Sequence, residues 1–141
     1  MKSFDSFVRE GKVKAISSDP ALARSLMSQA EDRLADLSGL HITDRNASFR
    51  FEQAYECLRE AIQAFMAIDG YKPYSHEAVF AYAYMNKLLS EAESMAADRY
   101  REIRNDINYK GQKTAKEEAE EILAFIKKAL SQLKGKFKSM Q

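Results

Sequence analysis

Apolar side chains recur every three or four residues along most of the chain, the spacing that places them on one face of an α-helix. Five stretches have this pattern: residues 20–38, 46–69, 75–92, 94–108 and 114–137. The clearest apolar stripe belongs to the second stretch and consists of Phe51, Tyr55, Leu58, Ile62 and Phe65. The spacing predicts an all-α fold, an antiparallel helical bundle of about five helices with short connections. A further short helix near residues 3–10 has a weaker pattern.

Residues that start or stop helices stand between these stretches. Asp19 before Pro20 is typical of an N-cap and a first helical position, and Ser75 is a second candidate N-cap. Thr114 and Glu117 have the spacing of a capping box. Three apolar stretches are followed by a glycine, as helices often are: Gly39, Gly70 and Gly111.

Composition narrows the class of protein. The chain has 141 residues, only three of them valine and two threonine, so there is almost no β-strand signal. This length fits one domain, residues 1–141, with a core at about 20–135, a short N-terminal extension and a basic C-terminal tail. Cys57 is the single cysteine, which excludes a disulfide framework and favours a buried small hydrophobe.

Charge and motifs exclude several functions. The net charge of +1 gives no general attraction to nucleic acid, so any such attraction must be local. No apolar run approaches the ~18 residues of a membrane span, and we expect a soluble, cytoplasmic protein that does not bind membranes. His41 and His76 are the only histidines and cannot form a zinc site alone. We therefore expect no metal and no cofactor.

One helical segment carries an unusual set of polar residues. Positions three and four apart place four of them on one face: Arg101, Arg104, Asn105 and Asn108. Guanidinium groups beside carboxamides suit the recognition of phosphate or of a nucleotide. The more common alternative is a solvated charged face, with Glu102 and Asp106 as ion-pair partners. Asparagine is a poor helix former, which weakens that alternative.

The same segment resembles a known family. The motif Arg104-Asn105-x-x-x-Tyr109-x-Gly111 is similar to the motif region of HEPN domains (higher eukaryotes and prokaryotes nucleotide-binding). Two upstream motifs also resemble that family: Tyr55-x-x-x-Arg59-x-Ala61 and Gly70-Tyr71-Lys72-Pro73-x-Ser75-His76. The resemblance covers about residues 20–135. It implies an antiparallel helical bundle that forms a homodimer, with the arginine motif in a cleft at the dimer interface. Many such domains are metal-independent ribonucleases of toxin–antitoxin and antiviral systems, and others are non-catalytic partners of a minimal nucleotidyltransferase.

The chain departs from the family at one position that matters. Catalytic members carry a histidine four to six residues after the arginine, where this sequence has Tyr109, Lys110 and Gly111. Because a phenol titrates near pH ~10, Tyr109 is a poor general base. The resemblance makes Arg104, Asn105 and Tyr109 the candidate catalytic residues, with Arg104 stabilising phosphate charge and Asn105 orienting it. His76 could replace the missing base if it folds nearby, but we favour a turn residue.

These observations predict binding more than turnover. The expected function is that of a HEPN-type protein which binds RNA or a nucleotide and has weak or no ribonuclease activity. The candidate binding residues are Arg101, Arg104, Asn105, Asn108 and Lys110. One alternative is a protein-interaction module that pairs with a partner such as a minimal nucleotidyltransferase. A third is an active metal-independent ribonuclease. The sequence leaves open the ligand and whether the protein is toxin or antitoxin.

The C-terminal tail is locally basic. No acidic residue follows Glu121, whereas five lysines do: Lys127, Lys128, Lys134, Lys136 and Lys138. We favour a solvated helix face here, and the alternative is attraction to a phosphate backbone. Gly135 is expected to fray the final helical turn.

Overall fold

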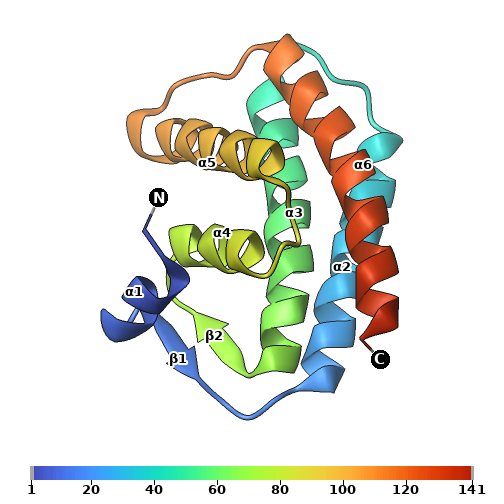
Figure 1. Ribbon diagram of the computed structural model, residues 1–141. Coiled ribbons are helices and arrows are strands. Elements are labelled where there is room, and N and C mark those ends of the chain that lie inside the picture. Colours follow the sequence, from blue (N-terminus) through green and yellow to red (C-terminus); the bar gives the residue numbers. More distant parts are fainter. Residues whose placement is uncertain (1, 141) are drawn as a thin grey trace.

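The computed structural model describes residues 2–140, which form six helices and one two-stranded sheet (Figure 1). The elements are α1 (Phe4–Arg9), β1 (Val13–Ala15), α2 (Pro20–Ser38), α3 (Ala47–Asp69), β2 (Tyr71–Pro73), α4 (His76–Met85), α5 (Glu91–Lys110) and α6 (Lys116–Ser139). The three long helices α2, α3 and α6 lie side by side, with α2 antiparallel to the other two. Helices α4 and α5 lie across one side of α3 (Figure 1). The mainly helical fold predicted from the sequence is confirmed.

Helix α3 is the centre of the core. It packs against α2 and α6 on one side and against α4 and α5 on the other. The predicted apolar stripe of this helix is buried, and each of its members is at most 1% exposed: Phe51, Tyr55, Leu58, Ile62 and Phe65. Burial of that stripe fixes how α3 is turned about its own axis, and so determines which of its other residues face the surface.

Most of the predicted helix starts are confirmed. The Asp19 carboxylate accepts a hydrogen bond from the Leu22 N–H at 3.0 Å, and the Ser75 hydroxyl accepts one from the Ala78 N–H at 3.4 Å. The predicted capping box at Thr114 is wrong. Helix α6 begins later, and Thr114 is buried, with its N–H donating to the Ser48 hydroxyl at 2.9 Å. Thr114 therefore ties the α5–α6 connection to α3 instead of capping α6.

The predicted helix over residues 75–92 is too long. Helix α4 ends at Met85, and Lys87 has a φ of 56°, a left-handed conformation that does not continue a right-handed helix. The leucines at 88–89 are buried and hold this turn against the core. Ser90 and Glu93 then form a true capping box at the start of α5. This early break allows α5 to reverse direction and pass over α3 next to α4.

The two-stranded sheet was not predicted. Strands β1 and β2 pair antiparallel, with Val13 opposite Pro73. Each strand has only three residues, and their pairing joins segments about 60 positions apart, which no local pattern reveals. The Ile16 N–H donates to the Gly70 carbonyl at 2.8 Å, and Gly70 has a φ of 86°. The sheet therefore holds the N-terminal segment against the α3–α4 connection and fixes where α4 begins.

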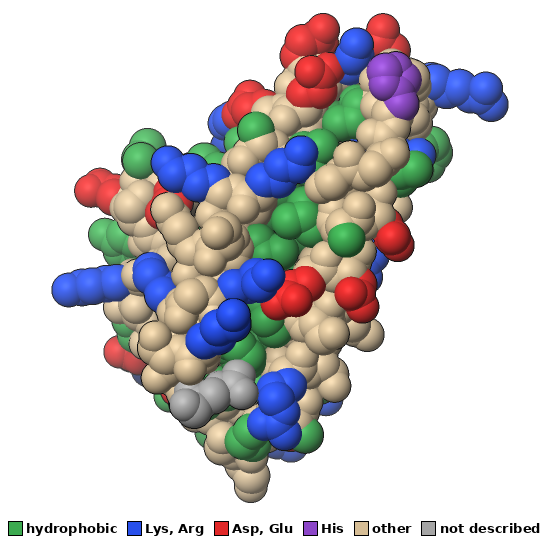
Figure 2. Space-filling view, turned by 90° about the vertical axis from the view of Figure 1, so that its right-hand side faces the viewer, with side chains coloured by type: hydrophobic (Ala, Val, Ile, Leu, Met, Phe, Trp, Pro, Cys, Tyr) green, Lys and Arg blue, Asp and Glu red, His purple; other side chains and the backbone are tan. Residues whose placement is uncertain are grey.

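The opposite face of the molecule is formed by α2 and α6. Figure 2 shows this face, where lysine and arginine side chains lie along a strip of apolar side chains. Helix α6 continues through Gly135 to Ser139, so the expected fraying at Gly135 is wrong. Phe137 is buried, and the Lys136 Nζ donates to the Lys87 carbonyl at 3.0 Å. These contacts hold the last turn against the α4–α5 connection.

None of the helices within residues 2–140 combines the length and the apolar content that a membrane crossing requires.

Candidate functional site

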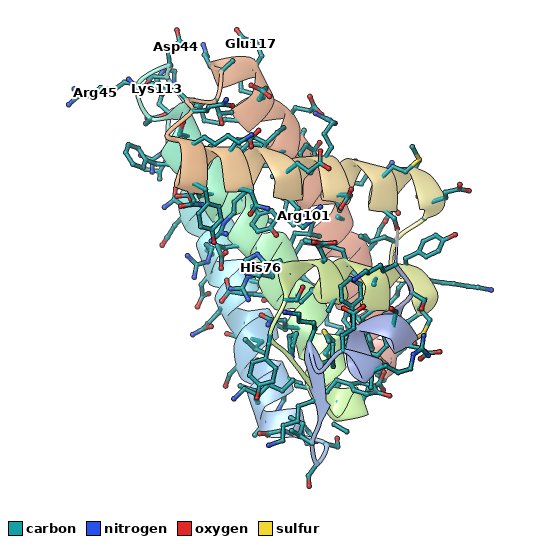
Figure 3. The ribbon with its side chains drawn as sticks, turned by 90° about the vertical axis from the view of Figure 1, so that its left-hand side faces the viewer. Asp44, Arg45, His76, Arg101, Lys113 and Glu117 are labelled. Atoms are coloured by element: carbon teal, nitrogen blue, oxygen red, sulfur yellow. The ribbon has the colours of Figure 1, made fainter. Side chains whose placement is uncertain are left out.

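Helix α5 crosses α3 above the start of α4, and a pocket of about 340 Å³ opens between them. We call it the α4–α5 pocket, and it is lined by Tyr74, Ser75, His76, Glu77, Arg101, Arg104, Asn105 and Tyr109. Figure 3 shows His76 at the start of α4 and Arg101 on α5 on this one face of the molecule. The pocket therefore unites two segments that are about 25 residues apart in the sequence.

Four residues predicted for the site lie in this pocket: Arg101, Arg104, Asn105 and Tyr109. Asn108 lies on the other side of Arg104, in a second pocket described below, and its Nδ2 donates to the Arg104 carbonyl at 3.0 Å. Lys110 lines neither pocket, and its Nζ lies 3.3 Å from the Asp106 carboxylate. The predicted face therefore borders two pockets, and Arg104 lines both of them.

Arg101 is held by carboxylates. Its Nη2 lies 3.1 Å from Asp98 Oδ1 and its Nη1 lies 3.8 Å from Glu77 Oε1. The Arg101 side chain is only 14% exposed. Asp98 and Glu77 are its partners in place of Glu102, which the alternative interpretation of a solvated charged face had suggested. These contacts fix the guanidinium of Arg101 at the wall of the pocket.

Arg104 has no such partner. The Arg104 side chain is half-buried, and its guanidinium makes no hydrogen bond and no ion pair with any of residues 2–140. Its Cζ lies 5.9 Å from the centre of the Tyr55 ring, a cation–π contact. A charge that is partly removed from water without a counter-ion is unfavourable. The Arg104 guanidinium is therefore free to bind an anion.

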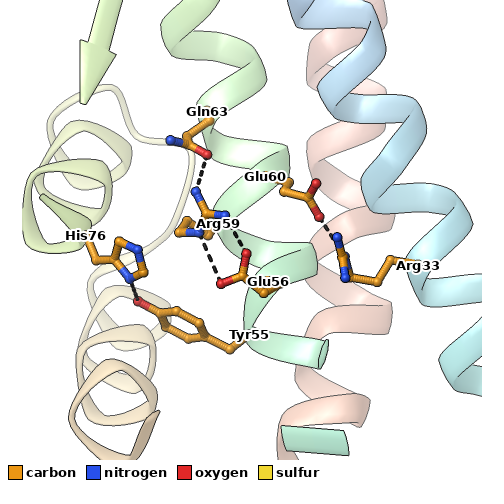
Figure 4. Close-up of polar contacts among 7 residues, drawn as sticks. All are labelled: Arg33, Tyr55, Glu56, Arg59, Glu60, Gln63 and His76. Atoms are coloured by element: carbon orange, nitrogen blue, oxygen red, sulfur yellow. Dashed lines mark hydrogen bonds and ion pairs between the residues drawn. The ribbon is translucent and has the colours of Figure 1, made fainter. Parts of the chain in front are cut away.

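His76 is part of the pocket and not only a turn residue. It is the first residue of α4, placed there by the Ser75 N-cap, and its Nδ1 lies 3.0 Å from the Tyr55 hydroxyl (Figure 4). The neutral imidazole has two tautomers. When the Tyr55 hydroxyl donates to Nδ1, the ring proton is on Nε2, which can donate to a ligand. When Nδ1–H donates to the Tyr55 hydroxyl, Nε2 carries no proton and can accept one.

The surroundings keep His76 neutral. Partial burial lowers the pKa of His76 below its ordinary value, and the nearby positive charges of Arg59 and Arg104 lower it further. Burial raises the pKa of Tyr55, so its hydroxyl keeps its proton. An anion bound beside Arg104 would offset the positive charges of Arg59 and Arg104 and so raise the pKa of His76.

Two separate ion pairs involve carboxylates of α3 (Figure 4). Arg59 binds the Glu56 carboxylate and the Gln63 side-chain carbonyl, and Arg33 Nε donates to Glu60 Oε1 at 2.8 Å. Burial alone would raise the pKa of Glu56, but its contacts with Arg59 outweigh burial and lower it. Glu56 is therefore ionised and forms an ion pair with Arg59, whereas Arg104 makes no ion pair within residues 2–140.

The second pocket, of about 480 Å³, opens on the other side of Arg104. We call it the α3 pocket, and it is lined by Arg33, Phe49, Glu52, Gln53, Glu56, Arg104 and Asn108. Phe49 is 65% exposed, although it is aromatic. Sequence reasoning missed this pocket, yet one signal was present: Phe49 lies off the apolar stripe of its helix.

Neither Cys57 nor a metal cluster of residues 2–140 offers a further reactive site. Cys57 is fully buried, and burial raises the pKa of its thiol to about 12. Among residues 2–140, no group of three or more His, Cys, Asp or Glu side chains is placed to hold a metal ion.

Comparison with known proteins gives no relative: no family model, no curated protein and no solved structure matches the chain. A function must therefore be argued from the two pockets.

Proposed function

We propose that the protein binds RNA or a nucleotide, with a phosphate of the ligand in the α4–α5 pocket. The observation that carries this proposal is the half-buried guanidinium of Arg104, which makes no ion pair and no hydrogen bond with any of residues 2–140. A phosphate would supply the missing negative charge and accept two parallel hydrogen bonds from one guanidinium. Arg104 is the principal binding group in this proposal.

The neighbouring residues have supporting roles. Arg101 is already oriented by Asp98 and adds a second positive charge to the same wall. The Asn105 side chain offers an amide donor, and neutral His76 offers Nε2–H when Tyr55 donates to Nδ1. Together they place donors around one anion from two helices. A fixed set of donors binds phosphate with little reorganisation.

We place this activity in a HEPN-type domain of a toxin–antitoxin or defence system, as the motifs around Arg104 suggest. Such a domain would act in the cytoplasm as a homodimer, alone or with a partner such as a minimal nucleotidyltransferase. Exposed aromatic residues at the pocket rim support a surface that meets another molecule: Tyr74 is 59% exposed and Tyr109 is 80% exposed. Tyrosine is enriched at such interfaces.

A second candidate function, metal-independent cleavage of RNA, is favoured by the position of His76. A neutral imidazole beside an arginine can remove the proton of a 2′-hydroxyl while the arginine stabilises the phosphate. The reaction also needs an acid for the leaving oxygen, and the exposed phenols of the pocket are Tyr74 and Tyr109. A phenol is in general a weak acid at neutral pH. We therefore expect cleavage that is slow relative to binding.

The test measures binding and cleavage on the same samples. Labelled single-stranded RNA is titrated with the protein in EDTA over a series of salt concentrations, and the RNA is then analysed on a gel. The proposal expects affinity that falls as salt rises, because phosphate contacts release counter-ions, and competition by inorganic phosphate. No binding at low salt would refute it. His76→Asn separates the two functions, since it should abolish any cleavage and keep the larger part of the binding, which Arg104 supplies.

A further inference from the structure

The α3 pocket differs in character from the α4–α5 pocket. Its lining carries as many carboxylates as guanidinium groups, namely Glu52 and Glu56 beside Arg33 and Arg104. The lining of the α4–α5 pocket has two arginines, Arg101 and Arg104, and one carboxylate, Glu77. Asp98 and Glu77 pair with Arg101, so the unpaired positive charge of this pocket is that of Arg104. The two carboxylates of the α3 pocket, Glu52 and Glu56, make it less favourable for a phosphate than the α4–α5 pocket. An uncharged group that offers an aromatic face and polar edges fits it better.

The side chains of the α3 pocket supply what such a group needs. Phe49 presents an exposed ring, on which a planar group can stack. The Gln53 carbonyl already accepts from Arg50 Nη1 at 3.0 Å, so its amide protons face no partner within residues 2–140. Asn108 uses Nδ2 on the Arg104 carbonyl, which leaves its side-chain oxygen as an acceptor.

Glu52 adds the strongest acceptor. Its carboxylate makes no hydrogen bond and no ion pair with any residue from 2 to 140, unlike Glu56, which is held by Arg59. An ionised carboxylate only accepts hydrogen bonds. It therefore suits a planar ring that carries an amino group, and it disfavours a ring edge made of carbonyl oxygens.

Arg104 lines both pockets. A ligand whose phosphate binds Arg104 in the α4–α5 pocket therefore has the group next to that phosphate close to the α3 pocket. We propose that the α3 pocket is a nucleobase site, in which a base with an exocyclic amino group stacks on Phe49 and donates to Glu52. The ligand class is then single-stranded RNA or a nucleotide of adenine, cytosine or guanine, and not a duplex, whose bases are already stacked and paired. This inference rests on the proposed function, since it needs the phosphate at Arg104.

The experiment compares short labelled RNAs that share one backbone: penta-adenylate, penta-uridylate and a five-unit abasic ribose-phosphate strand. The wild type should bind penta-adenylate more tightly than the other two. Phe49→Ala should weaken binding of penta-adenylate by about tenfold, the effect of one stacked base, and leave the abasic strand unaffected. Glu52→Gln should reduce the preference for adenine over uracil, because an amide both donates and accepts. Phe49→Trp keeps an aromatic ring and should bind penta-adenylate about as tightly as the wild type, unlike Phe49→Ala.

A matched control removes a different exposed aromatic residue. Tyr84 is 51% exposed on α4 and lines neither of the two pockets, so Tyr84→Ala should change no affinity. Equal affinity of the wild type for penta-adenylate and for the abasic strand, unchanged by Phe49→Ala, would overturn the nucleobase site and leave the phosphate site standing. Failure of all three strands to bind would overturn both.

Discussion

Arg104→Ala is the sharpest perturbation of the proposed phosphate site, because the structure predicts a large effect on binding and a small effect on stability. A hydrogen bond to a charged group contributes about 1.5–3 kcal/mol, which corresponds to roughly a 10- to 150-fold weaker Kd when it is lost. Since the Arg104 guanidinium has no other partner within residues 2–140, its loss breaks no ion pair.

The expected change in stability follows from the remaining contacts of Arg104. Its cation–π contact with Tyr55, at 5.9 Å, contributes about 0.5–1 kcal/mol. Removal of the charge also relieves repulsion from Arg59 and Arg101, which acts in the opposite direction. We therefore expect the free energy of unfolding to change by less than about 1 kcal/mol, or a few degrees in Tm.

The assay is fluorescence anisotropy of a labelled single-stranded RNA, paired with thermal denaturation followed by circular dichroism. Arg99→Ala is the matched control, since Arg99 lies on the same helix and carries the same charge but pairs with Glu121 outside both pockets. It should leave the Kd unchanged. The reasoning is refuted if Arg104→Ala binds RNA as the wild type does, if both variants weaken binding equally, or if Arg104→Ala lowers Tm by well over ten degrees.

Three further predictions concern the fold and its response to acid. A Cβ on Gly70 would lie 2.5 Å from the Ile16 carbonyl oxygen at a φ of 86°, so Gly70→Ala should destabilise the protein by about 2 kcal/mol or more in urea denaturation. Gly135→Ala meets nothing within 4 Å and should stabilise it by about 0.5–1 kcal/mol, and a loss of stability there would contradict the helical packing of the last turn. His76 has a pKa below its ordinary 6.5 in the folded protein, so the unfolded chain binds this proton first, and stability should fall as pH drops below about 6.5. His76→Asn keeps an acceptor for Tyr55 and should reduce that loss, whereas an unchanged pH profile would show that His76 does not contribute to it.

The sequence determined the helices because their signals are local. The apolar stripe from Phe51 to Phe65 and the N-caps at Asp19 and Ser75 act within a few residues, and each is confirmed. The end of α4 at Met85 was missed because apolar residues continue to 88–89, and only their burial against the core shows that they anchor a turn. The pairing of β1 with β2 joins distant segments and has no local signal.

The sequence also placed Arg101, Arg104 and Asn105 on one helix face, since helical spacing alone decides that. Only the tertiary structure brought His76 and Tyr55 to that face, because the crossing of α5 over α3 and the start of α4 depend on packing between helices. It also decided which charges are neutralised. Arg101 pairs with Asp98 and Glu77, whereas Arg104 makes no ion pair within residues 2–140. This difference in pairing, not the residue type, makes Arg104 the principal binding group of the proposed site and Arg101 a supporting one.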